Sequence, residues 1–485
     1  MPRIKRRRAA AAGADRLSDL PDDLLRLILR RLDTRTALST AVLARRWARL
    51  SLDLPVLDIR VGDVLPPRYH RALAVRRGCD PARTTAVAAV RELDAVVTQC
   101  ERRVMRAFAD GVTGLMTAAD DVEDRRRVKT LRVEFFPFTM EEESDSCVVD
   151  CLIPTAIAAW GVEDLEVVAR PLHLDDLHVG PAYTFPHHCL DDDLHRSRLR
   201  SLTLANCTVP PLHRCGALVL SDMPASTPMA TYRGLFTSNS PLQSLRLKSC
   251  RCARDELVIS APGGSRLREL VVDGCSFREI HLRDLPSLER LACLTSPHDE
   301  LGCFLEGAPP TVASLVVRLT GPSRWITPRP LGMKLHGLTR LLVADVPASW
   351  DVTCVPRLLL HAAPSLQVLH IHVATPDRNE EPPGHEVSWP VRSRFRHRHL
   401  REIVLAGFGR TWRQVFFVRY LARVCKALER VVLLENWCAR EKGLWDWDLV
   451  RQRECPWTEE DKMVIRKQIK YGRTWCRPQL QVLVG

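Results

Sequence analysis

A short pattern of hydrophobic positions, apolar-x-x-apolar-x-apolar, recurs through most of the chain. Typical copies are LRSLTL from Leu199, LQSLRL from Leu242 and LREIVL from Leu400. Each copy has the length of one short β-strand with alternate side chains turned toward a core. The further copies begin at Val128, Val162, Cys215 (a weaker copy), Leu267, Leu288, Val312, Leu338, Leu366 and Leu428. The pattern therefore predicts a stack of similar units, each of which contributes a strand.

The spacing of the copies indicates the kind of stack. From Leu242 to Leu366, successive copies start 25, 21, 24, 26 and 28 residues apart, within or near the period of leucine-rich repeats. Three copies continue to Cys207, Cys250 and Cys275, where such repeats place Asn or Cys inside the turn after the strand. We therefore predict an α/β fold, a leucine-rich-repeat solenoid (horseshoe), and a structural role for these three cysteines.

Residues 16–50 have a helical periodicity instead. Pro21, Asp22 and Asp23 favour a helix start, since proline fits a first turn and acidic side chains suit the positive end of the helix dipole. Thr34 or Thr36 is expected to cap a second helix. The apolar positions of three successive segments are Leu24, Leu25, Ile28, Leu29 and Leu32, then Leu38, Val42 and Leu43, then Trp47 and Leu50. A module of about 40 residues buries too little surface to be stable alone, so it either caps the solenoid or docks on a partner.

The order of residues in this module resembles the F-box of plant F-box/leucine-rich-repeat proteins. The matching positions are Asp15, Leu17, Ser18, Leu20, Pro21, Asp22, Leu24, Leu25, Ile28, Leu29, Leu32, Thr34, Ala37, Val42, Leu43, Arg45, Arg46 and Trp47. Asp33 stands where the family usually has proline, and Ala44 where it usually has serine. Neither departure removes a large apolar side chain.

The resemblance implies a non-catalytic substrate-recognition subunit of an SCF-type cullin-RING ubiquitin ligase, with no cofactor. In that family the F-box docks on a Skp-type adaptor, which links it to cullin and RING subunits. Helix faces that pack into an apolar groove concentrate their binding energy in a few anchors. The adaptor-binding residues implied here are Leu20, Pro21, Leu24, Ile28, Leu29, Leu43 and Trp47.

The carboxy-terminal part resembles the FBD-type ending of plant F-box proteins. The matching positions are His397, Leu400, Ile403, Gly407, Phe408, Gly409, Leu421, Leu428 and Glu429. The expected organisation is a basic disordered tail (1–14), the F-box (15–55), a helical linker or entry region (56–127), the repeat solenoid (128–436) with its FBD-like end (395–436), and a C-terminal tail (437–485).

The residues between the repeat leucines are expected to line the concave face of the sheet, where a substrate would bind. The face is mixed but leans basic, which suits an acidic or phosphorylated protein segment. The alternative interpretation, which is favoured for any one of these residues taken alone, is an ordinary solvated strand position. The candidates are Arg246, Lys248, Arg290, Arg318, Arg340, His370 and His372.

Composition bears on the partners and on the compartment. Lys and Arg total 71 against 58 Asp and Glu, and this formal charge of +13 favours acidic partners or nucleic acid. The basic run from Lys5 to Arg8 is either a nuclear import signal or a solvated tail. The start has no apolar run suited to a signal peptide or membrane span, and the 17 cysteines are an odd number. We therefore expect a reducing compartment, the nucleus or the cytoplasm.

Two other functions stay open at this point. The first is a basic nuclear protein that binds nucleic acid or an acidic partner without a ligase role, although aromatic residues, the usual stacking platforms, make up only 6%. The second is a zinc enzyme at a His-rich insertion, residues 173–195, which lacks paired C-x-x-C or H-x-x-x-H spacing. Nucleotide-binding and common hydrolase motifs are absent from the sequence, and we expect no metal site.

Overall fold

A computed structural model describes the chain as two compact units. Unit 1 comprises residues 1–174 and 186–199, and unit 2 comprises residues 175–185 and 200–485. The described residues are 20–78, 86–120, 126–137, 145–171, 182–191, 197–212, 215–236, 240–251, 256–260, 265–277, 279–295, 304–305, 307–318, 334–346, 359–373, 396–435, 437–439, 445, 449–451, 457–470 and 480–485.

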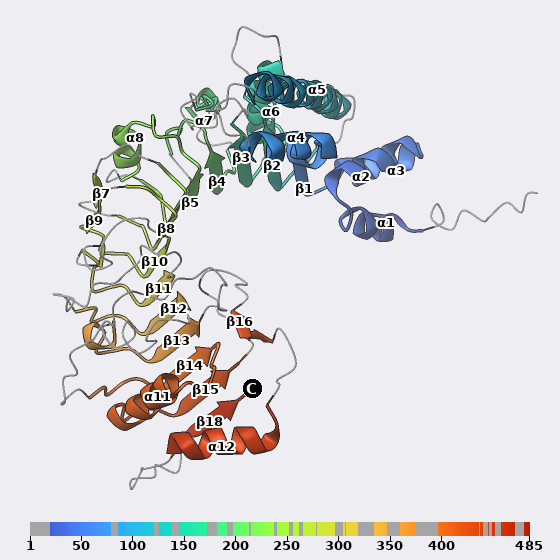
Figure 1. Ribbon diagram of the computed structural model, residues 1–485. Helices are drawn as coiled ribbons and strands as arrows, with labels where there is room; N and C mark the ends of the chain where they lie inside the picture. Colours follow the sequence, from blue (N-terminus) through green and yellow to red (C-terminus); the bar gives the residue numbers. More distant parts are fainter. Residues whose placement is uncertain are drawn as a thin grey trace, which may run out of the picture. The chain divides into compact units, whose positions relative to one another are not determined.

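Unit 1 begins with the helical module, formed by α1 (Asp22–Leu29), α2 (Thr34–Ser39), η1 (Thr40–Val42) and α3 (Arg45–Leu52), as Figure 1 shows. The helix start expected at Pro21 is confirmed, with Asp22 in the first turn of α1. The expected cap of the second helix is wrong. The backbone N–H of Thr36 donates to Asp33 Oδ1 at 2.8 Å, because Asp33 has the extended backbone and the short acceptor side chain that an N-cap requires.

The rest of unit 1 is a small parallel sheet with helices. It consists of β1 (Val56–Arg60), η2 (Val61–Val64), α4 (Pro67–Gly78), α5 (Ala86–Asp120), β2 (Thr130–Phe135), α6 (Asp145–Ala158), β3 (Asp164–Ala169) and α7 (His188–Asp191). β2 pairs in parallel with both β1 and β3. The region predicted as a helical linker therefore also contributes a strand to this sheet. α5 packs against α4 and α6 and buries Val97, Met105 and Val112.

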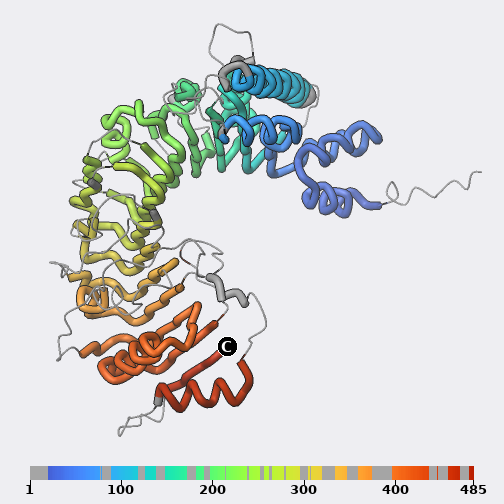
Figure 2. The backbone as a smooth tube through the Cα atoms, viewed as in Figure 1, coloured from blue at the N-terminus to red at the C-terminus, as the bar shows by residue number. Residues whose placement is uncertain are grey.

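Unit 2 is a regular succession of parallel strands, which Figure 2 traces as repeated loops of the backbone. In order across the sheet, its strands are β4 (Ser201–Ala205), β5 (Ala217–Ser221), β6 (Ser244–Lys248), β8 (Glu269–Asp273), β10 (Arg290–Thr295), β11 (Ser314–Arg318), β12 (Arg340–Val346), β13 (Val368–Val373), β14 (Glu402–Ala406), β15 (Arg430–Leu434) and β18 (Gln481–Val484). β7 (Glu256–Ser260) and β9 (Glu279–Arg283) form a separate parallel pair. Helices α8 (Met229–Gly234) and α11 (Trp412–Val424) lie between strands in the sequence. The predicted α/β repeat solenoid is confirmed.

The repeat leucines form the core of unit 2, as the pattern predicts. Equivalent positions such as Leu245, Leu270, Leu291, Leu315 and Leu341 are fully buried and in register. The three repeat cysteines are also buried, and each thiol contacts backbone carbonyl oxygens of its own turn or the preceding repeat. These contacts are Cys207 Sγ to Ala205 O, Cys250 Sγ to Leu220 O and Lys248 O, and Cys275 Sγ to Asp273 O.

The segment predicted as a C-terminal tail is folded where the structure describes it. It holds β16 (Trp437–Ala439), β17 (Leu449–Arg451), α12 (Glu459–Lys470) and β18. β18 pairs in parallel with β15 and so extends the repeat sheet. Arg410 forms a 3.1 Å ion pair with Asp461 on α12. Among the helices that the structure describes, none combines the length and apolar character needed to span a membrane.

Candidate adaptor-binding surface and open face of the repeats

The helical module exposes several large apolar side chains although it has a core of its own. The core contains Leu25, Leu29, Trp47 and Leu50, each at most 7% exposed. On the outside, the exposed fractions are 46% for Leu24, 56% for Leu27, 38% for Leu32, 89% for Val42 and 73% for Leu43. Several large apolar side chains exposed on so small a module are typical of an interaction surface.

The predicted adaptor-binding residues separate into two groups in the structure. Pro21, Leu24 and Leu43 are exposed, and Leu20 and Ile28 are half-buried. Leu29 and Trp47 lie in the core of the module instead of on its surface. Helical spacing alone marks apolar positions without showing which ones turn inward, and for the same reason it does not single out the exposed Leu27, Leu32 and Val42.

Charged contacts hold the module together around these apolar positions. Arg46 on α3 forms a 2.6 Å ion pair with Asp22 and donates to the backbone oxygen of Leu20, also at 2.6 Å. Arg26 on α1 reaches Asp53 at 3.0 Å. These bonds fix α3 against the start of α1, so the exposed leucines of α1 are presented on a braced helix.

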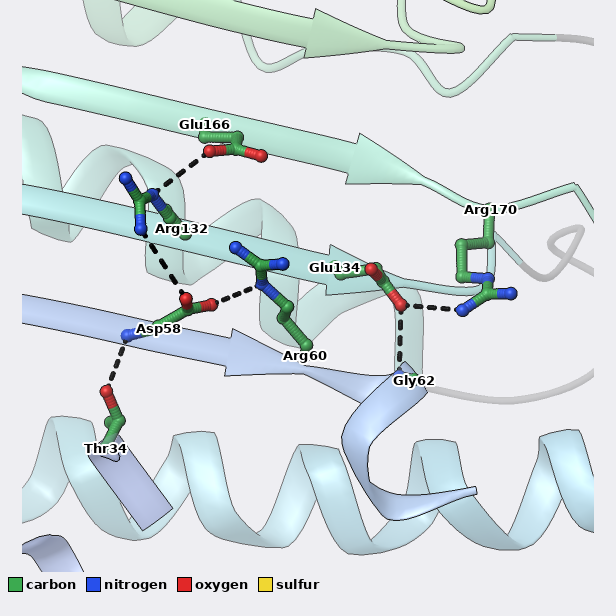
Figure 3. Close-up of polar contacts among 8 residues, drawn as sticks. All are labelled: Thr34, Asp58, Arg60, Gly62, Arg132, Glu134, Glu166 and Arg170. Atoms are coloured by element: carbon green, nitrogen blue, oxygen red, sulfur yellow. Dashed lines mark hydrogen bonds and ion pairs between the residues drawn. The ribbon is translucent and has the colours of Figure 1, made fainter. Parts of the chain in front are cut away.

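A polar network connects the module to the sheet of unit 1 (Figure 3). The backbone N–H of Asp58 on β1 donates to Thr34 Oγ1 at the start of α2, at 2.8 Å. On the same face, Asp58 pairs with Arg60 at 2.6 Å, and Arg132 on β2 pairs with Glu166 on β3 at 3.2 Å. The first strand therefore carries both the attachment of the helical module and one end of a row of ion pairs.

The predicted substrate-face residues of unit 2 include exposed side chains, side chains in ion pairs and buried side chains. Arg246, Lys248 and Arg340 are exposed. Arg290 pairs with Glu269 at 2.6 Å, and Arg318 pairs with Asp345 at 3.0 Å.

The expectation that His370 and His372 are accessible is wrong, since they are only 6% and 7% exposed. Burial, with the nearby charges of His370 and Arg318, lowers the pKa of His372 to about 3. The hydrogen bond from His370 lowers the pKa of Glu402. These histidines are enclosed because the outward positions of neighbouring strands, such as Leu342 and Val404, are themselves covered.

The FBD-like end has a structural histidine. His397 is 2% exposed, its Nε2 bonds the backbone oxygen of Ala363 at 2.9 Å, and its Nδ1 accepts the N–H of Leu400 at 3.1 Å. Burial lowers the pKa of His397. Gly407 follows β14 with φ +77°, and a Cβ there would lie 2.6 Å from the carbonyl oxygen of Val373. The motif residues therefore join successive repeats.

The His-rich insertion falls largely outside the described residues, which omit 172–181 and 192–196. His187 and His188 are described and exposed. Within the part of the chain that the structure covers, no three His, Cys, Asp or Glu side chains are grouped as metal ligands.

Comparisons with known proteins agree with this geometry. An F-box domain model matches residues 17–58. An F-box/FBD/LRR-repeat protein of Arabidopsis thaliana is 33% identical over 125 residues, which cover 25% of this chain and 24% of the relative. A second Arabidopsis thaliana protein of that description is 49% identical over 47 residues, 10% of this chain and 11% of the relative. The MEIOTIC F-BOX protein MOF of Oryza sativa subsp. japonica is 38% identical over 112 residues, 19% of this chain and 23% of the relative.

The matched segments span a quarter or less of each of these relatives. The repeat architecture of unit 2 agrees with the repeats in two of their names. Residues 17–58 are therefore an F-box domain, and the chain is similar to plant F-box/FBD/LRR-repeat proteins.

Proposed function

We propose that this chain is the substrate-recognition subunit of an SCF-type cullin-RING ubiquitin ligase. Its F-box binds a Skp-type adaptor, and its repeats bind a protein substrate. The observation that carries this proposal is the exposed apolar surface of the F-box helices, formed chiefly by Leu24, Leu27, Val42 and Leu43. Because the core of the module is already filled, these side chains are available to a partner groove.

Within that surface we assign different roles to the predicted residues. Leu24 and Leu43 act as direct anchors, with Pro21, Leu20 and Ile28 beside them. Leu29 and Trp47 support the surface from inside, so their substitution would weaken binding by loosening the module. Anchors of this kind commonly account for most of the binding energy of an interface.

The proposed mechanism is proximity without catalysis by this chain. A substrate held on the repeats stays close to a ubiquitin-loaded enzyme on the RING subunit, which raises the effective concentration of the reacting groups. We place this activity in the nucleus or the cytoplasm, where the cullin and RING partners would meet a chain with free thiols such as Cys207 and Cys250.

The test is co-purification of the full chain with a Skp-type adaptor. Leu43→Asp should reduce adaptor binding by at least ~100-fold, since a charge would replace an anchor at a desolvated contact. Val75→Asp is the matched control, because Val75 is 56% exposed on α4, outside the F-box. Circular dichroism should show both variants folded. Equal binding by both variants, or no binding by the folded wild-type chain, would contradict the proposal.

The nucleic-acid alternative receives less support from the open face of the unit 2 sheet, by which we mean the face opposite the buried repeat leucines. Arg290, Arg318 and Arg430 each pair with a carboxylate there, which reduces the positive potential available to phosphates. The alternative predicts binding to DNA or RNA that needs no adaptor and weakens steeply with salt. Electrophoretic mobility shifts at 50 and 200 mM salt would detect it.

A further inference from the structure

One row of side chains on the open face of unit 2 is apolar, although the sheet has its leucine core on the other face. Val271, Ala292, Val316 and Leu342 are register partners on β8, β10, β11 and β12. Each comes one position after a core leucine, so it points to the opposite face of the sheet. All four are at most 2% exposed. We call these four residues the apolar row.

Trp445 packs on this row. The cluster that it contacts contains the row together with Leu294 and Ala344. The guanidinium carbon of Arg290 lies 6.0 Å from the centroid of the Trp445 ring, within the range of a cation–π contact. A tryptophan is thus seated between aliphatic side chains and one arginine on the face where a repeat protein binds its ligands.

The chain reaches this position through a small hairpin. β16 and β17 pair antiparallel, with Trp437 opposite Arg451, and Trp445 lies between them in the sequence. β16 also contacts β14, and Figure 1 shows it beside the repeat strands. The occupant of the apolar row is therefore a segment of this same chain that returns from the end of the solenoid.

We propose that the apolar row is a docking groove for an aromatic side chain of a partner polypeptide, and that Trp445 occupies it in cis. The partner is identified by chemistry as a segment with an aromatic residue next to an acidic one. This inference rests on the proposed function only in naming the ligase substrate as that partner. The apolar row belongs to unit 2 and the adaptor surface to unit 1, so the two can be tested separately.

The charges beside the row indicate the acidic neighbour. Arg290 and Arg340 lie in register on one side of it, through Ser314, and Arg318 lies on the other side. Arg290 and Arg318 already pair with Glu269 and Asp345, so a partner carboxylate beside the aromatic anchor would exchange with these side chains for the same guanidinium groups. In the chain's own sequence, Trp445 is followed by Asp446.

An occupant in cis suppresses binding in trans. A segment of the same chain competes at an effective concentration on the order of 1 mM. The apparent affinity of a competing partner is reduced by the fraction of molecules whose groove is open. Removal of Trp445 should therefore strengthen binding of an aromatic-acidic peptide while it removes an interaction from the folded chain.

The test uses the full chain and a fluorescent synthetic peptide of residues 440–450, followed by fluorescence anisotropy. We expect the Trp445→Ala chain to bind this peptide at least ~10-fold more tightly than the wild-type chain, because the tethered competitor is gone. A peptide with both Trp445→Ala and Trp447→Ala should lose at least ~10-fold of that affinity, because Trp447 is likewise followed by an acidic residue. Arg290→Gln in the Trp445→Ala chain should lose several-fold. Trp412→Ala is the matched control chain, since Arg413 stacks on Trp412 and Trp412 is 72% exposed on α11.

If the wild-type and Trp445→Ala chains bound the peptide with equal affinity, or if the two peptides bound with equal affinity, the proposal that the apolar row binds an aromatic side chain would be wrong. If Trp445→Ala does not fold, fluorine NMR of the wild-type chain labelled with fluorotryptophan gives a second measurement. Excess peptide should shift the Trp445 resonance, assigned with Trp445→Phe, and an unchanged resonance would reject displacement. Adaptor binding is measured on the same preparations. Lost peptide binding with retained adaptor binding rejects only the groove, and the reverse rejects only the ligase role.

Discussion

The open faces of the two units are made from the same strand pattern but present opposite chemistry. On β1–β3 the outward residues Asp58, Arg132 and Glu166 are half-buried and linked by ion pairs. On β8–β12 the equivalent positions hold the apolar row, which is buried. The inward leucines do not distinguish the units, since Leu131 and Leu315 are both fully buried. The core residues therefore build the solenoid, and the outward residues decide what each part of it can contact.

The turns after the strands differ in the same way. In unit 2, β4, β5, β6, β8 and β14 are each followed by a residue with positive φ, namely Asn206, Asp222, Ser249, Gly274 and Gly407. In unit 1, β1 runs into η2, and β2 and β3 are followed by Phe136 and Arg170, which are not among the positive-φ residues. Left-handed residues reverse the chain sharply after a strand. Unit 2 thus repeats a tight turn, while unit 1 connects its strands with wider helical segments.

The test with the largest expected effect on stability places the same substitution, Val→Asn, on the open face of each unit. Val316→Asn should lower the free energy of unfolding by about 3 kcal/mol, because it leaves a buried amide without partners and a small void. Val168→Asn on β3 should change it by about 0.5 kcal/mol or less, since Val168 is half-buried beside Glu134. Urea unfolding of both full-length variants measures the difference. Equal effects would mean that the apolar row is not covered in solution.

A second test concerns the tight turns. Gly407→Ala should destabilise unit 2 by about 2 kcal/mol, because alanine at φ +77° is strained and its Cβ would approach Val373 O to 2.6 Å. Gly409→Ala is the matched control. It lacks a positive φ, and its Cβ would meet nothing closer than 3.9 Å. Thermal unfolding by calorimetry reports both, and a control as unstable as Gly407→Ala would locate the effect in helix α11 instead of the turn.

How far the sequence predicts this molecule depends on which face a residue occupies. Leucines at alternate positions predict strands, and each copy of the pattern that we recognised forms a strand in the structure. The copy at β1 reads LPVLDI from Leu54 and fits the pattern, but Pro55 makes it look like a linker. β18 is hidden for another reason, since its segment reads QLQVLV from Gln479 and lacks a leading leucine.

The candidate sites were harder to predict because exposure depends on tertiary cover. The arginines of the open face follow from the repeat rule, but the burial of His370 and His372 does not. A signal was nevertheless present in the strands LVV from Leu270 and LLV from Leu341. Strands that are apolar on consecutive positions are typical of sheets covered on both faces. No local pattern names Trp445 as part of the cover, because it lies more than 100 residues away from the row in sequence.

The buried histidines make the stability of unit 2 depend on pH. Burial lowers the pKa of His397 and lowers that of His372 to about 3, against about 6.5 in an unfolded chain. Below about pH 6.5 the unfolded state binds more protons than the folded state, so stability is complete above this pH and falls on acidification. The slope is up to about 1.4 kcal/mol per pH unit for each histidine.

Hydrogen exchange with mass spectrometry at pH 7.5 and 5.5, corrected for intrinsic rates, resolves this effect by unit. Protection around β13 and β14 should fall on acidification. The sheet of unit 1 should change less, because the histidines whose side chains are described there, His70, His187 and His188, are exposed. His372→Asn should reduce the loss in unit 2. An unchanged slope in this variant would assign the pH dependence to other groups.

Breaking the ion pairs of unit 1 should have the smallest effect on stability. The physical origin of that effect should also differ most clearly from the origin of the effect in unit 2. Arg132 and Glu166 are 43% and 34% exposed in their side chains, so a double-mutant cycle with Arg132→Met and Glu166→Gln should give less than about 1 kcal/mol of coupling. At 1 M salt the screening length is about 3 Å, and the coupling should nearly vanish. The penalty for Val316→Asn should persist at that salt, because it arises from desolvation and packing instead of screened charge. A salt-resistant Arg132–Glu166 coupling would show that the open face of unit 1 is also covered in solution, and the contrast between the two faces would then be lost.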